Sequence, residues 1–177
     1  MEIKMKIYKC TMNELDKTAE FYDRVVEYLD AHTNYPKWIR GTYPGYESTK
    51  AAIEDGGQYI CEDKGKIVGA FIINENPQGN YAVGGWSVDL NEGEYLVIHT
   101  LAVDPEMYGK GIAKRMVEYC IAAAKERGYR AARLDVVPTN EPAVRLYESM
   151  GFKFAGECDL GRFADLIPTF LLYEMNF

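Results

Sequence analysis

Histidine is scarce in this sequence, and cysteine is sparse and scattered. The two histidines, His32 and His99, do not lie at a metal-ligand spacing, so we expect no metal site. The four cysteines form no C-x-x-C pair; they are Cys10, Cys61, Cys120 and Cys158. We expect them to be buried apolar residues, as in a protein of the reducing cytoplasm.

The sequence also lacks a long hydrophobic run and an excess of positive charge. No apolar stretch approaches ~18 residues, so no segment is predicted to span a membrane. The first ten residues, MEIKMKIYKC, carry charges inside their apolar run, unlike a signal peptide. The formal net charge of -7 argues against a general nucleic-acid binder and is compatible with a cationic substrate. We therefore expect a cytoplasmic protein that binds neither nucleic acid nor membrane.

What the sequence does contain is enough apolar residues for one folded domain. The chain has 177 residues, of which 47% are hydrophobic, and it shows no internal repeat, low-complexity tract or linker. A chain of this length buries roughly 70% of the surface that its unfolded form exposes. We therefore expect a single domain over 1–177 that folds without disulfides or metals.

The spacing of apolar residues predicts strands that alternate with helices. Strands are expected at 3–9, 58–62, 66–73, 94–103, 132–137, 153–159 and 169–176. Helices are expected at 13–29, 47–54, 112–127 and, after a cap at Thr139 or Asn140, up to Gly151. The turn-rich stretch 31–46 is expected to be irregular or a short helix, and 74–93 is expected to be a loop, with a short strand allowed near Trp86. This order of elements is typical of an α/β fold with a mixed sheet.

The segment 97–116 carries the strongest functional signal. It runs from a strand through a turn with Gly109 and Gly111 into a helix. Glycines let main-chain N–H groups approach a ligand closely, and the unpaired N–H groups at a helix N-terminus favour an anion. Lys110 and Lys114 add positive charge. The pattern therefore predicts a phosphate or pyrophosphate site, held mostly by main chain.

Other interpretations of these two glycines differ in how well they fit. An ordinary strand-to-helix turn stays open, because two glycines before a helix are common. The G-x-G-x-x-G motif of dinucleotide-binding proteins is excluded because its third glycine is missing, and a Walker motif because no G-K-[ST] follows the gap. A binder of nucleotide phosphates would bind ATP that coenzyme A does not displace.

The segment resembles the motif of the GNAT superfamily of acyl-CoA-dependent N-acyltransferases. That motif is [Q/R]-x-x-G-x-[G/A], after a strand ending in L-x-V-x-P. The strand matches at Leu101, Val103 and Pro105, and the turn matches over 108–113, except that Tyr108 replaces Arg or Gln. A second family motif, N-x-x-A-x-x-L-Y-x-x-x-G-F, is matched by NEPAVRLYESMGF at 140–152. The resemblance covers residues 95–157.

The resemblance implies a fold and a cofactor. The fold would be a single domain with a mixed, mostly antiparallel sheet of about six to seven strands, splayed centrally, with helices on both faces. The co-substrate would be acetyl-CoA, with its diphosphate on the turn amides and its pantetheine arm along the strand. The residues implied to bind it are Leu101, Ala102, Val103, Tyr108, Gly109, Lys110, Gly111, Ile112, Ala113, Asn140, Ala143 and Tyr147.

The reaction implied is attack of a neutral amine on the thioester. An alkylamine has a pKa of about 10.4, so a base or water must take its proton. His99, on the strand 94–103, is the predicted base and Glu94 the second choice; the alternative for His99 is a histidine bonded within the sheet. Tyr147 is the predicted acid that protonates the thiolate, or else a core residue. Asn140 would bond the cofactor arm, cap its helix, or both.

The acceptor amine leaves a weaker signal. Aromatic faces attract cations, so Tyr35, Trp38, Tyr43 and Trp86 are candidate acceptor-binding residues, although aromatic residues near proline and glycine also cover core edges. The acceptor would be a small-molecule or peptide amine, and exposed edge strands would permit a homodimer. The competing hypothesis is a domain that binds or senses acyl-CoA without catalysis.

Overall fold

The computed structural model describes residues 5–177, so residues 3 and 4 of the first predicted strand lie outside the described part. The chain forms two compact units. The first comprises residues up to Asn34, Trp38–Ile73 and Thr100–Tyr119; the second comprises Tyr35–Lys37, Asn74–His99 and Cys120–Phe177. The single domain expected over 1–177 stays a prediction.

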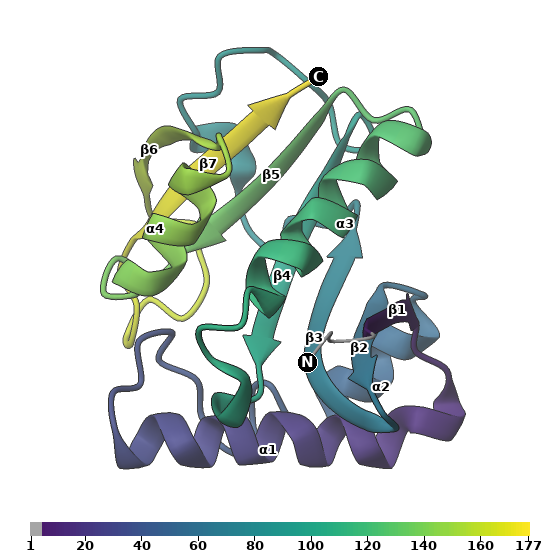
Figure 1. Cartoon of the computed structure of the whole chain (residues 1–177). Helices are drawn as coiled ribbons and strands as arrows, with labels where there is room; N and C mark the ends of the chain where they lie inside the picture. The colour runs from purple at the N-terminus through teal and green to yellow at the C-terminus, as the bar shows by residue number, and fades with distance from the viewer. Residues whose placement is uncertain (1–4) are drawn as a thin grey trace. The chain divides into compact units, whose positions relative to one another are not determined.

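The described residues form a mixed sheet and four α-helices (Figure 1). The strands are β1 (Met5–Lys9), β2 (Gln58–Asp63), β3 (Lys66–Asn74), β4 (Tyr95–Val103), β5 (Ala131–Val136), β6 (Lys153–Cys158) and β7 (Phe170–Asn176). The helices are α1 (Leu15–Ala31), α2 (Tyr46–Glu54), α3 (Ile112–Glu126) and α4 (Glu141–Ser149). The strand order is β1-β2-β3-β4-β5-β7-β6. β4 and β5 pair in parallel, whereas β1–β2, β2–β3, β5–β7 and β6–β7 are antiparallel. The expected α/β fold with a mixed, mostly antiparallel sheet is confirmed.

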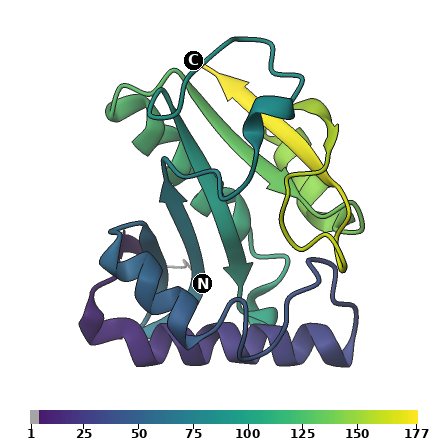
Figure 2. The same ribbon diagram turned by 180° about the vertical axis from the view of Figure 1, so that it is seen from behind.

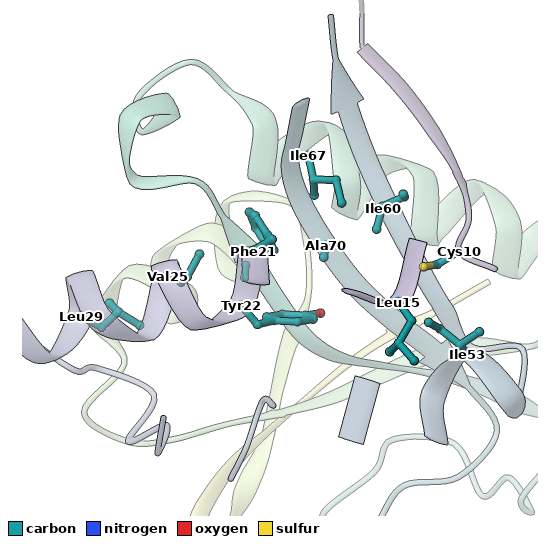
Figure 3. Packing of buried hydrophobic residues seen from close by; sticks show 11 residues of the cluster. Cys10, Leu15, Phe21, Tyr22, Val25, Leu29, Ile53, Ile60, Ile67 and Ala70 are labelled. Atoms are coloured by element: carbon teal, nitrogen blue, oxygen red, sulfur yellow. The ribbon is translucent and has the colours of Figure 1, made fainter. Parts of the chain in front are cut away.

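In the first unit, α1 packs its apolar stripe against β2 and β3. A capping box starts the preceding 3-10 turn: the Thr11 N–H donates to the Glu14 carboxylate at 2.8 Å. The buried face of α1 forms one cluster with strand residues such as Ile60 and Ala70 (Figure 3). Lys64 and Gly65 both have positive φ, 51° and 81°, as a two-residue hairpin requires, so the predicted β2–β3 hairpin is confirmed.

The beginning of α3 covers the other face of β2 and β3. Tyr119 lies with its ring 5.6 Å from Tyr59 and 5.9 Å from Phe71. A Cβ at Gly69 would lie 2.6 Å from the Met116 sulfur, so glycine at this position lets α3 approach β3 closely. These contacts hold the N-terminal half of α3 against β2 and β3, and Ile112 in its first turn is also buried.

In the second unit, β5 lies at the centre of a four-stranded ladder. Tyr95–Val97 of β4 pair with Ala131–Arg133 of β5, and β7 joins β5 to β6. In Figures 1 and 2, α4 covers one face of these strands and the irregular segment 74–93 covers the other. Tyr81 and Leu90 of that segment belong to the buried cluster, with Trp86 packed against it.

Most predicted elements are present in the described residues, with ends shifted by a few positions. The short strand allowed near Trp86 is wrong, since 74–93 holds a 3-10 turn at Tyr81–Val83 instead. The reason lies in its bonds: the Trp86 indole donates to Tyr81 O at 2.6 Å, and the Ser87 N–H donates to the Glu174 carboxylate at 2.8 Å. Among residues 5–177, no helix has the length and apolarity needed to cross a bilayer.

Candidate functional site

The turn between β4 and α3 belongs to the first unit and is built by local caps. The Asp104 carboxylate accepts the Glu106 N–H at 3.0 Å, and Pro105 fits the first position of the 3-10 turn that follows. Gly109 and Gly111 then adopt φ values of +75° and +76°, in the left-handed region that L-residues with side chains avoid. This backbone path explains why both positions carry glycine.

The space beside the two glycines is open. A Cβ built on Gly109 or Gly111 meets no atom within 4 Å, and residues 108–111 are all exposed. The first N–H groups of a helix have no intrahelical acceptor and carry partial positive charge, so the head of α3 faces an accessible space with free donors. A diphosphate fits this chemistry. The Lys110 ammonium lies 3.2 Å from Glu106 O, at the margin of the same turn.

Tyr108 occupies the turn position where the family motif has Arg or Gln. Its side chain is half exposed and packs edge-on against Tyr28 of α1, with the ring centres 5.9 Å apart. Tyr28 in turn stacks on His32 at 4.0 Å. Partial burial raises the pKa of the Tyr108 phenol, so its hydroxyl keeps its hydrogen and offers a neutral donor where the motif has Arg or Gln.

The outer edge of β4 has free main-chain groups at the predicted positions. The Asp104 N–H donates to Val68 O on β3 at 2.9 Å, and Ala102 is buried. Main-chain groups of successive strand residues point to opposite edges. The N–H and C=O groups of Leu101 and Val103 therefore point away from β3, and both residues are partly exposed.

A bulge in β4 lies directly before Leu101. Thr100 has φ +50°, an unusual value for a β-branched residue within a strand. The Tyr22 hydroxyl donates to Thr100 O at 3.1 Å, and the Tyr43 hydroxyl is hydrogen-bonded to Thr100 Oγ1. Trp38 packs edge-on against Tyr22, with the ring centres 6.4 Å apart. Of the four aromatic residues predicted to bind the acceptor, Tyr43 thus contacts Thr100 directly, and Trp38 contacts Tyr22, the other hydrogen-bond partner of Thr100.

In the second unit, α4 presents Asn140 and Tyr147. Asn140 is the N-cap, and its side-chain oxygen accepts the Ala143 N–H at 3.4 Å, which leaves its NH₂ group free for another partner. Tyr147 is buried at 6% exposure and packs edge-on against Phe152. Within residues 5–177, no hydrogen-bond partner is found for its hydroxyl. Burial raises the pKa of Tyr147, so the hydroxyl stays protonated at neutral pH.

His99 lies in β4 with 8% of its surface exposed. Its Nε2 atom is 3.0 Å from the side-chain oxygen of Asn74 and 2.9 Å from the main-chain oxygen of Asn76. Both partners are acceptors, so Nε2 carries the hydrogen and donates. Burial lowers the pKa of His99 to about 4, which makes the ring a weak base. The geometry favours the sheet-bonded alternative for this residue.

Glu94 precedes β4 and is engaged elsewhere. Its carboxylate accepts the Asn91 N–H at 2.8 Å and pairs with Arg130 at 3.1 Å. The hydrogen bond from the Asn91 main chain, followed by that from Arg130, lowers the pKa of Glu94. A carboxylate with a lowered pKa is a poorer proton acceptor near neutral pH.

The other two aromatic candidates lie in the second unit. The main-chain oxygen of Tyr35 accepts the Thr139 hydroxyl at 3.0 Å, while its side chain is exposed. Trp86 lies over the Arg133 guanidinium at 4.2 Å, and Tyr95 lies on that guanidinium at 4.3 Å. Trp86 therefore has a packing partner that explains its presence without an acceptor.

One polar cluster was not foreseen as a unit. The buried Asp135 carboxylate accepts the Tyr81 hydroxyl at 2.7 Å and pairs with Arg162, whose guanidinium also donates to Gln78 O at 2.9 Å. These bonds give Asp135 a structural role in the second unit. In the sequence, the local signal for this role is that Asp135 lies within a predicted strand of mostly apolar residues. Among the described residues, no three His, Cys, Asp or Glu side chains group as metal ligands.

Comparisons with known proteins identify relatives that match most of the chain. The model of the Acetyltransferase (GNAT) family matches residues 16–152. An uncharacterized N-acetyltransferase of Methanocaldococcus jannaschii is 28% identical over 148 residues, which are 83% of this chain and 60% of the relative. N-acetyltransferase 8B of Homo sapiens is 30% identical over 135 residues, which are 72% of this chain and 54% of the relative. The chain thus spans only 54% to 60% of the length of these relatives.

Solved structures share the fold. A GNAT-family acetyltransferase of Streptococcus agalactiae superposes with a TM-score of 0.79 at 19% identity, covering 100% of this chain and 98% of the other. A protein of Salmonella typhimurium, solved with its cofactor acetyl-CoA, superposes with a TM-score of 0.68 at 16% identity, covering 97% and 93%.

Proposed function

Because this chain belongs to the GNAT acetyltransferase family, we propose that it is an acetyl-CoA-dependent N-acetyltransferase. It would move an acetyl group to a primary amine of a small molecule or peptide, by direct attack of the amine on the thioester. The net charge of -7 is compatible with a cationic acceptor. A cytoplasmic location and a homodimer stay predictions.

The observation that carries this proposal is the open turn at the head of α3. Gly109 and Gly111 hold a left-handed path, and among residues 5–177 nothing beyond their own chain neighbours lies within 4 Å of either Cβ position. The diphosphate of coenzyme A would bind the main-chain N–H groups of residues 108–113, with Lys110 beside them. The pantetheine arm would pair with the free edge of Leu101 and Val103. We also propose contacts from Asn140, Ala143 and Tyr147 of the second unit, as the family resemblance implies.

Two groups of this chain would act on the thioester. Acetyl-CoA supplies an activated acyl group. The Leu101 N–H would donate to the carbonyl oxygen as negative charge develops on it, and a donor of this kind typically changes kcat by about 10²–10³. The Tyr147 hydroxyl would protonate the departing thiolate, since it carries its hydrogen at neutral pH and no hydrogen bond to another described residue occupies it.

The proton of the acceptor amine needs another route. His99 donates through Nε2 and has a lowered pKa, and Glu94 is held by Asn91 and Arg130. We therefore propose that water, rather than either side chain, accepts this proton. Tyr43, which bonds Thr100, and Trp38, which packs on Tyr22, are the proposed acceptor contacts; Tyr35 and Trp86 have weaker support.

The bonds that engage His99 and Glu94 also favour the second candidate, a domain that binds acyl-CoA without catalysis. Incubation with acetyl-CoA and a panel of amines, with release of free thiol followed over time, separates the two. Thiol release that depends on one amine supports the enzyme. Tight binding of acetyl-CoA with no release for any amine supports the binding domain, and no binding of coenzyme A or its esters refutes both. ATP that binds and is not displaced by coenzyme A would indicate a nucleotide-phosphate site.

A further inference from the structure

The strained residue of β4 is held by hydrogen bonds on both its main chain and its side chain. Thr100 adopts φ +50°, where a β-branched side chain is disfavoured, so surrounding contacts must stabilise this conformation. Tyr22 of α1 bonds the Thr100 carbonyl oxygen at 3.1 Å, and Tyr43 bonds the Thr100 hydroxyl. The two bonds have different effects, since only the first acts on the peptide that links Thr100 to Leu101.

A hydrogen bond from Gln58 determines the direction of the Tyr22 hydrogen bond. The side-chain NH₂ group of Gln58 lies 3.2 Å from the Tyr22 oxygen, and also 3.1 Å from each of the main-chain oxygens of Tyr59 and Phe71. With two carbonyl oxygens as neighbours, this end of Gln58 must be the donor. The Tyr22 oxygen therefore accepts from Gln58 and directs its own hydrogen to Thr100 O.

The Tyr22 hydroxyl is shielded from water. Its side chain has 1% of its surface exposed and lies within the core cluster drawn in Figure 3. Trp38 covers it edge-on. Burial raises the pKa of the phenol, so the donor hydrogen is present at every pH where the protein is folded. A shielded bond between two neutral groups holds its geometry better than one that competes with solvent.

This bond also orients the next N–H group. A trans peptide is planar, so its C=O and N–H vectors point in opposite directions. Fixing Thr100 O toward Tyr22 therefore aims the Leu101 N–H to the opposite side, and a hydrogen bond to the carbonyl polarises the same amide and makes its N–H a stronger donor. We infer that Tyr22 is a positioning residue that aims and strengthens the Leu101 N–H as the donor to the thioester carbonyl. This inference rests on the proposed function.

The test compares Tyr22→Phe with Tyr8→Phe. Phenylalanine keeps the ring and removes the hydroxyl. Tyr8 is the control because it also loses one hydroxyl hydrogen bond, 2.9 Å to Glu62, in the β1–β2 part of the same unit. The readout is the infrared carbonyl stretch of acetyl-CoA labelled with ¹³C at the carbonyl, bound to each protein without an acceptor. No knowledge of the amine is needed.

In the wild type and in Tyr8→Phe, we expect the bound carbonyl stretch to lie below that of free acetyl-CoA. In Tyr22→Phe, it should move back towards the free value, while the Kd for coenzyme A, which has no acyl carbonyl, stays unchanged. With an active amine, kcat should fall by about tenfold, less than for a deleted oxyanion donor, and the KM for acetyl-CoA should not change. A purely structural role would not separate these readouts.

Each other result has a defined meaning. A carbonyl stretch that stays as low in Tyr22→Phe as in the wild type overturns the positioning role and leaves the proposed function intact. No binding of acetyl-CoA to the wild type refutes the proposed function and this inference together. Thr100→Gly, which tolerates positive φ and removes only the Tyr43 bond, should keep the lowered stretch. If Thr100→Gly loses it, the bond from Tyr43 is needed to position the donor, and the assignment of this role to the Tyr22 bond is overturned even where Tyr22→Phe does not fold.

Discussion

Replacing Gly111 with alanine tests the proposed diphosphate site directly. Gly111 has φ +76°, and its Cβ position is empty to 4 Å, so the added methyl group meets no protein atom and enters the space proposed for the diphosphate. The left-handed conformation costs an alanine about 1–2 kcal/mol in folding free energy. Displacing the diphosphate from one main-chain donor costs a further roughly 1.5–3 kcal/mol in binding. At 1.4 kcal/mol per tenfold, the Kd for coenzyme A should rise about tenfold to a hundredfold.

Gly65→Ala is the matched control. Gly65 lies in the same unit, has φ +81° and also has no atom within 4 Å of its Cβ position, but it belongs to the β2–β3 hairpin turn. Both variants should lower Tm by about 2–8 °C. Isothermal titration calorimetry with coenzyme A should then show weakened binding in Gly111→Ala only. Equal affinities in the two variants would refute the assignment of the turn.

Two further perturbations address the catalytic residues. Tyr147→Phe should lower kcat by at least tenfold with little change in the Kd for coenzyme A, as expected for a general acid. The control Tyr173→Phe, which loses a hydroxyl hydrogen bond of 2.9 Å to Glu148, should leave kcat unchanged. Equal kcat values in Tyr147→Phe and the wild type would refute the acid role. His99 has a pKa lowered from 6.5 to about 4 in the folded protein. Between these pH values the unfolded chain binds more protons than the folded one, so the free energy of unfolding should rise with pH between about 4 and 6.5, by up to roughly 3 kcal/mol. Chemical denaturation should show a shallower rise in His99→Gln, and an unchanged slope would contradict the buried, neutral assignment.

The regular elements of the fold were predictable because their signals are local. The helix α3 shows apolar residues at helical spacing between Gly111 and Gly128, and the side chains of the sequence narrowed the α4 cap to Thr139 or Asn140, of which the structure has Asn140. The turn with Gly109 and Gly111 was equally readable, because left-handed conformations select glycine. The Asp63-Lys64-Gly65 hairpin follows the same logic.

Residues whose roles depend on distant partners were not predictable. The residues next to Thr100 in the sequence do not predict its positive φ. Its conformation depends on Tyr22, which is 78 positions away in the chain. His99 seemed suited to base chemistry because of its ordinary pKa, but its oxygen acceptors at Asn74 and Asn76 come from another segment. The sequence also offers Trp86 as an acceptor contact, but its stacking on the distant Arg133 guanidinium could not be predicted from its neighbours in the chain.

The aromatic cover over Arg133 limits how the segment 74–93 can vary. Irregular surface segments usually tolerate substitutions and insertions well. This one is different, because Trp86 and Tyr95 enclose a guanidinium that is only 2% exposed and that donates to Val88 O at 2.8 Å. A chain that lost this cover, or changed the spacing between Trp86 and Val88, would leave a buried guanidinium without its aromatic contacts or its acceptor at Val88 O. Sequence drift in this stretch should therefore be slower than its lack of regular structure suggests.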